Sequence, residues 1–113
     1  MEDEKPMARA LELKLTHAGF EVQSAFNGED GLLLLEKETP ALILCDLIMP
    51  KVDGFKVLET LKERKNKTPV IVLTNLSQED DQKRAMALGA KEFFIKSNTS
   101  IATIVERVIE FLK

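Results

Sequence analysis

Three residues whose side chains could take part in acid–base or phosphoryl chemistry stand at the ends of apolar runs. Asp46 follows Ala-Leu-Ile-Leu-Cys, Thr74 ends Pro-Val-Ile-Val-Leu-Thr, and Lys96 follows Glu-Phe-Phe-Ile. Short apolar runs of this kind predict buried strands, and the carboxyl ends of parallel strands meet at one edge of a sheet. We therefore expect a carboxylate, a hydroxyl and an amine to converge at that edge.

Further carboxylates are expected at the same edge. Glu2, Asp3 and Glu4 come directly before a predicted helix, which would follow a strand in a βα arrangement. Two like charges about 4 Å apart repel by ~4 kcal/mol at an effective dielectric of about 20, so such a cluster needs a counter-charge. Mg²⁺ meets this need because it binds oxygen ligands octahedrally. A carboxylate can also act as a nucleophile and form an aspartyl phosphate, whose oxygens the amine and the hydroxyl would stabilise.

Around these residues, strand patterns alternate with helical ones. Asn27 and Ser77 are predicted N-caps, because each precedes an acidic residue by three positions. The alternation predicts an α/β fold, a doubly wound parallel sheet with right-handed crossovers and helices on both faces. The expected strands are 21–25, 41–45, 69–74 and 92–95, and the expected helices are 6–18, 27–37, 53–65, 78–88 and 99–112.

Composition limits the classes of protein that fit. The chain has 113 residues, 44% hydrophobic and 31% charged, which suits one domain over residues 1–113. Its formal net charge of -3 gives no electrostatic reason for direct nucleic-acid binding. Cys45 is the only cysteine, so no intramolecular disulfide is expected, and no leader or long apolar span is visible. We expect a cytoplasmic protein that does not insert into a membrane.

Four motifs in this sequence resemble those of the receiver domain of bacterial two-component response regulators, and the resemblance extends over nearly the whole chain. Asp46 with the Met-Pro and Asp-Gly that follow resembles the phosphoacceptor loop of that family, and Thr74 resembles its switch threonine. Phe-Phe-Ile before Lys96 resembles its last strand with the family lysine. Glu-Asp-Glu after Met1 resembles its acidic pair and the residue that follows the pair.

The resemblance implies a flavodoxin-like fold and assigns roles to the site residues. Asp46 would accept the phosphoryl group, Lys96 would pair with acid or phosphate oxygens, and Thr74 would hydrogen-bond the phosphoryl group. Phe93 would reorient as Thr74 moves. The metal ligands implied for Mg²⁺ are Glu2, Asp3, Asp46 and the carbonyl of Ile48.

The resemblance also implies a function and partners. A histidine kinase, a phosphotransfer protein or a small phosphodonor would supply the phosphoryl group of a phosphorelay. Phosphorylation would then shift the population of a docking face for a downstream effector protein. The domain would catalyse only its own phosphorylation and dephosphorylation, so it is not expected to be an enzyme in the ordinary sense. We expect a single-domain regulator, since no output domain follows in this sequence.

The start of the chain departs from the family pattern. Receivers have a hydrophobic first strand before the acidic pair, whereas only Met1 precedes it here, so four of the family's five strands are expected. In the family's strand order, 2-1-3-4-5, this strand lies between two others, and its absence leaves an apolar slot between two open edges. At about 25 cal/mol per Å² of buried apolar surface, the loss of this strand lowers the stability of the domain by several kcal/mol. We expect an oligomer, a strand-exchanged assembly or a rearranged sheet.

Two other classes remain open at this point. One is a phosphorylation-independent interaction module, or a truncated or engineered receiver fragment, that oligomerises through its open sheet edges. The other is a flavodoxin-like flavin binder, which shares the architecture. The flavin binder has little support, because no Ser/Thr-rich loop follows the second predicted strand and the chain has no Trp or Tyr to stack on a flavin.

Overall fold

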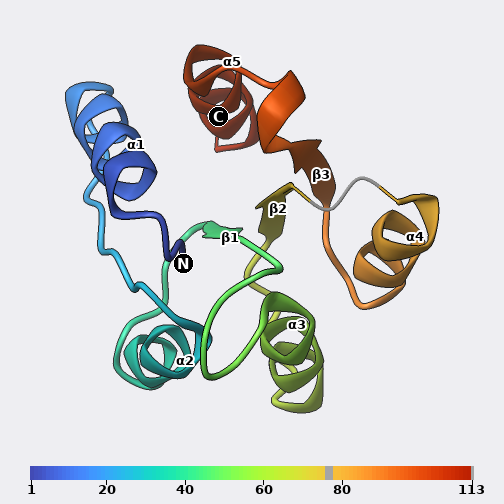
Figure 1. Cartoon of the computed structure of the whole chain (residues 1–113). Coiled ribbons are helices and arrows are strands. Elements are labelled where there is room, and N and C mark those ends of the chain that lie inside the picture. Colours follow the sequence, from blue (N-terminus) through green and yellow to red (C-terminus); the bar gives the residue numbers. More distant parts are fainter. Residues whose placement is uncertain (76–77, 113) are drawn as a thin grey trace.

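The computed structural model describes residues 1–75 and 78–112 (Figure 1). Strands and helices alternate along most of the chain, as the sequence pattern predicts. The elements are α1 Lys5–His17, α2 Gly28–Lys37, β1 Ile43–Cys45, α3 Gly54–Glu63, β2 Val70–Thr74, α4 Glu79–Ala87, β3 Glu92–Ile95, a 3₁₀ turn η1 Lys96–Asn98, and α5 Ile101–Phe111.

The three strands form one parallel sheet in the order β1-β2-β3. Strand β2 lies in the centre, and all five of its residues are buried. One apolar cluster joins the sheet to α2, α3 and α4, and two others join it to α1 and α5. Helices therefore cover both faces (Figure 1), and the predicted flavodoxin-like α/β fold is confirmed.

Side-chain caps fix where several helices begin. The Asn27 side chain accepts a hydrogen bond from the Asp30 amide at 2.8 Å, and the Asp53 side chain does the same for Lys56 at 2.9 Å. Each bond satisfies an amide that has no partner within its helix. Helix α4 begins after Gln78, and the predicted cap Ser77 lies outside the described residues.

The predicted strand at 21–25 is wrong. In the part of the chain that the structure describes, the sheet has three strands, and this segment is not one of them. The described residues give it one backbone hydrogen bond to the rest of the chain, from the Glu2 amide to the Ala25 carbonyl at 2.9 Å. A strand needs a neighbour along its length, and no strand lies beside this segment. The order of the other strands follows the chain, so the sheet is not rearranged.

Met1 lies between the 21–25 segment and β1 (Figure 1). Its ammonium donates to the Leu44 carbonyl at 2.8 Å, and its own carbonyl accepts from the Asp46 amide at 3.1 Å. These two bonds are those of a residue paired in parallel with Cys45. Met1 therefore acts as the end of a strand, although a single residue does not form one.

No helix within the described residues combines the length and the apolar character that a membrane span requires.

The buried amino terminus predicts how stability depends on pH. Burial lowers the pKa of the Met1 ammonium below its ordinary 8.0, so the folded chain holds this proton less tightly than the unfolded chain. The stability linked to this group is present above the ordinary pKa and is lost as the pH falls through the lowered one. We expect urea denaturation to give a larger free energy of unfolding at about pH 8.5 than at about pH 6.5.

Acetylation of the amino terminus supplies the control. It removes the titrating group but keeps an N–H that can donate to Leu44. The acetylated chain should lose the pH difference, and a difference of unchanged size would contradict the assignment to Met1.

Candidate functional site

Asp46 lies directly after β1, with only 4% of its surface exposed. Its Oδ1 accepts a hydrogen bond from the Ile48 amide at 3.1 Å, and its Oδ2 accepts one from Lys96 Nζ at 2.7 Å. The start of α3 packs closely against this loop, because a Cβ at Gly54 would collide with the Asp46 carbonyl oxygen. The Asp-Gly pair of the sequence therefore caps α3 and lets it approach the Asp46 loop.

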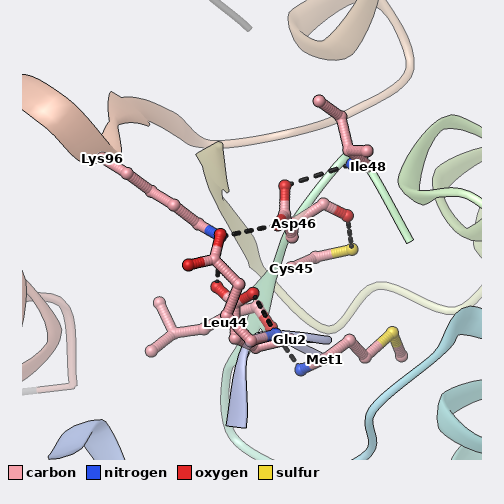
Figure 2. A network of polar contacts seen from close by, with 8 residues as sticks. Met1, Glu2, Leu44, Cys45, Asp46, Ile48 and Lys96 are labelled. Carbon is pink, nitrogen blue, oxygen red and sulfur yellow. Dashed lines mark hydrogen bonds and ion pairs between the residues drawn. The ribbon is translucent and has the colours of Figure 1, made fainter. Parts of the chain in front are cut away.

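Lys96 reaches the same place from the end of β3. Its ammonium lies 2.7 Å from Asp46 Oδ2 and 2.6 Å from Glu2 Oε1 (Figure 2). It also lies 3.1 Å from Glu4 Oε1. Burial alone would lower the pKa of Lys96, but hydrogen bonds to the three carboxylates outweigh it, and the pKa is raised. Lys96 therefore stays charged and serves as the counter-ion of the cluster.

Glu2, Glu4 and Asp46 could together hold a metal ion. Each offers one carboxylate oxygen, and these oxygens all lie within 4.8 Å of one another. Glu2 is 6% exposed, and burial raises the pKa of its carboxyl despite the hydrogen bond to Lys96. Such a cluster of oxygen donors, with Glu2 and Asp46 buried and Glu4 exposed, suits a hard divalent cation such as Mg²⁺.

The structure differs from the expected ligand set at two positions. Asp3 is exposed and is not part of this cluster, whereas Glu4, which was expected at this edge but not as a metal ligand, is part of it. Glu4 stands two residues after Glu2, and its amide donates to Glu2 Oε2 at 3.1 Å. The position of Glu4 two residues after Glu2 was the one feature of the sequence that could have placed it in the cluster. The roles of Asp3 and of the Ile48 carbonyl stay predictions.

The remaining predicted residues lie on the neighbouring strands. Thr74 is fully buried at the end of β2 and is paired with Ile95, the residue before Lys96. Phe93 packs against the cluster on the α3 and α4 side, and Phe94 packs on the α1 and α5 side. The register thus puts Thr74 at the expected edge and Phe93 on the opposite face from Phe94.

Cys45 lies beside the site but is not a reactive group. It is fully buried, and its thiol donates to the Asp46 carbonyl at 3.3 Å. Burial raises the pKa of the thiol to about 12, so it stays protonated at neutral pH. Its role is to fill the space between β1 and the helices.

Replacing Lys96 by Met tests its role as counter-ion. The change leaves Glu2 and Asp46 buried together without the ammonium. We expect Lys96→Met to lower the free energy of unfolding by about 3 kcal/mol in magnesium-free buffer, because removing one partner of a buried ion pair leaves uncompensated charge. Urea denaturation measures the loss, and added Mg²⁺ should restore part of it.

Lys83→Met is the matched control. Lys83 pairs with Glu79 at 3.3 Å, but both side chains are well exposed. Its loss should cost less than about 1 kcal/mol, as for other surface pairs. Equal losses in the two variants would contradict a special role for Lys96.

Known proteins with a similar sequence and fold are receiver domains. The family model described as "Response regulator receiver domain" matches residues 1–109. The chain is similar to the receiver domain of the Francisella response regulator 1452, with a TM-score of 0.92 and 27% identity over 98% of this chain and 91% of that one. It is also similar to the signal receiver domain of a histidine kinase from Syntrophus aciditrophicus, with a TM-score of 0.87 and 30% identity over 99% of this chain and 86% of that one.

Curated relatives include longer regulators. The "Probable transcriptional regulator ycf27" of Pyropia yezoensis is 38% identical over 85% of this chain, and the "Transcriptional regulatory protein AfsQ1" of Streptomyces coelicolor is also 38% identical over 85%. The chain spans less than half the length of these two relatives, 39% and 42% respectively. The match of the family model over residues 1–109 leads to one conclusion. The chain belongs to the response regulator receiver domain family.

Proposed function

We propose that residues 1–113 form a receiver domain that accepts a phosphoryl group on Asp46 in an Mg²⁺-dependent reaction. The observation that carries the proposal is the pairing of Asp46 Oδ2 with Lys96 Nζ at 2.7 Å, within a cluster of three carboxylates of which those of Asp46 and Glu2 are buried. Hydrogen bonds from Ile48 and Lys96 hold the buried Asp46 carboxylate in one orientation. The Lys96 ammonium is already in place to balance the negative charge that develops during the transfer.

The transfer itself requires little of the protein beyond positioning and charge. One oxygen of the Asp46 carboxylate attacks the phosphorus, and the bond from phosphorus to the donor nitrogen or oxygen breaks and leaves its electron pair on the donor atom. Lys96 balances charge on the phosphoryl oxygens, and the Thr74 hydroxyl hydrogen-bonds one of them. Bound Mg²⁺ would supply further neutralisation of the phosphoryl oxygens.

The metal would be held by Asp46 and Glu2, with Asp3 and the carbonyl of Ile48 as the remaining ligands implied by the family. The geometry adds Glu4 as a competing donor, since its carboxylate lies in the cluster and that of Asp3 does not. We propose that Asp3 turns inward when the cation binds, because its side chain is exposed and it stands next to Glu2 in sequence.

The proposed output is a change of the docking face. Thr74 and Phe93 would move together, since β2 and β3 pair directly and Phe93 is only partly buried against the α3 and α4 side. The proposed partners are a histidine kinase or phosphotransfer protein and a downstream effector, in the cytoplasm. We propose no direct nucleic-acid contact, no membrane contact and no catalysis beyond the domain's own phosphorylation and dephosphorylation.

Substitution of Asp46 tests the phosphoacceptor. We expect the wild-type chain to gain one phosphoryl group from acetyl phosphate with Mg²⁺, measured as a mass increase of the intact protein, and Asp46→Asn to gain none. Asp53→Asn is the matched control, because Asp53 is a nearby acid and asparagine can still cap α3. Phosphorylation of Asp46→Asn, or its loss in Asp53→Asn alone, would contradict the proposal.

Two further variants decide between Asp3 and Glu4 as metal ligands. Titration calorimetry should show that Asp3→Asn weakens Mg²⁺ binding by at least about tenfold, and that Glu4→Gln weakens it by less than about threefold. The difference is expected because Glu4 is already engaged with Lys96 at 3.1 Å. The reverse order of effects would assign the metal to the Glu4 carboxylate and would exclude Asp3.

A further inference from the structure

Lys96 is shared among three carboxylates. Its ammonium donates hydrogen bonds to Asp46 Oδ2 at 2.7 Å and to Glu4 Oε1 at 3.1 Å. Glu2 Oε1 lies 2.6 Å away as an ion-pair partner. An ammonium carries three N–H donors, and the Lys96 side chain is only 6% exposed. Each donor therefore has a carboxylate oxygen within reach, and a phosphoryl oxygen can pair with Lys96 only by replacing one of them.

Two of the three carboxylates are held by further bonds. Asp46 Oδ1 accepts a hydrogen bond from the Ile48 amide at 3.1 Å (Figure 2). Glu2 Oε2 accepts one from the Glu4 amide, also at 3.1 Å. Asp46 and Glu2 are both buried, so neither can exchange its contact with Lys96 for water. These two carboxylates are therefore costly to displace from the ammonium.

Glu4 is the carboxylate that can leave at low cost. Its side chain is 55% exposed, and its distance to Lys96 is the longest of the three. An exposed ion pair contributes little to stability, because water solvates the charge that is released. In the described part of the chain, Glu4 stands just before α1 without a side-chain hydrogen bond that caps the helix. Its release therefore leaves the start of α1 intact.

We propose that Glu4 takes the place of a phosphoryl oxygen on Lys96 and must leave that place when Asp46 is phosphorylated. Glu4 is then a positioning residue that opposes phosphorylation, a role that rests on the function proposed above. Its carboxylate engages one Lys96 donor in the resting chain, and it repels the negative charge of an incoming phosphoryl group. Rotation of the Glu4 side chain into water removes both effects and frees the donor.

The sign of the effect separates this role from that of a metal ligand. Loss of a ligand weakens the binding of Mg²⁺, and with it the binding of a phosphoryl group that the metal neutralises. Loss of a competing carboxylate strengthens the binding of the phosphoryl group and leaves the affinity for Mg²⁺ nearly unchanged. A neutral residue at position 4 therefore distinguishes the two roles.

Beryllofluoride is the probe, because it binds an aspartate carboxylate in the place of a phosphoryl group and is not hydrolysed from it. The 113-residue chain is titrated with beryllofluoride at saturating Mg²⁺, and the amide resonance of Thr74 is followed. We expect Glu4→Gln to lower the dissociation constant by about threefold to fivefold, as for the release of one exposed charge. The rate of phosphorylation by acetyl phosphate should rise by a similar factor.

Glu63→Gln is the matched control. Glu63 is exposed at the last residue of α3, whose first residue, Gly54, packs against the Asp46 loop. Its replacement changes the net charge by the same amount at the far end of that helix. The dissociation constant of beryllofluoride should stay at the wild-type value in Glu63→Gln. The urea midpoint of Glu4→Gln should also match the wild type, because the residue is exposed.

The wild-type chain shows which proposal fails, if one does. Where acetyl phosphate adds a phosphoryl group to Asp46, unchanged or weaker beryllofluoride binding in Glu4→Gln overturns the role of Glu4 alone. An equal gain of affinity in Glu63→Gln overturns it too, since net charge then explains the effect. Where the wild-type chain takes up neither beryllofluoride nor a phosphoryl group, the proposed function fails and the role of Glu4 fails with it.

Discussion

The ion pairs of Lys96 with Glu2 and Asp46 are the interaction on which the arrangement of the site depends. They join three points that are far apart in sequence, namely the amino terminus, the end of β1 and the end of β3. Both carboxylates are buried, so each would be costly without a cation nearby. The lysine therefore links the amino terminus and the ends of β1 and β3, and it keeps the acidic cluster stable before any metal binds.

The amino terminus is the second constraint, and it is linked to the first. Met1 takes one position of a parallel ladder beside β1, and Glu2 extends from that position toward Lys96. The position of the Glu2 carboxylate therefore depends on the backbone hydrogen bonds that Met1 and Glu2 make with Asp46 and Ala25, and on the buried Met1 ammonium.

Much of the fold can be predicted from local sequence, and the predictions that failed did so for physical reasons. The strand at 92–95 and the cap Asn27 are set by residues close in sequence, so pattern and capping chemistry predict them. The segment 21–25 has a strand pattern, but pairing depends on a neighbour that the pattern cannot reveal. Glu4 was expected at the same edge, but its place in the carboxylate cluster was not predicted, because that place depends on how far Lys96 reaches across the sheet edge.

The most direct test of the account is to locate the phosphoryl group chemically. The chain is incubated with acetyl phosphate and Mg²⁺, the acyl phosphate is reduced with borohydride, and peptides are sequenced by mass spectrometry. The account predicts homoserine in place of Asp46, and none when Mg²⁺ is chelated. Homoserine at Asp53 or Asp3 instead, or an unmodified Asp46 under conditions that phosphorylate a control receiver, would contradict it.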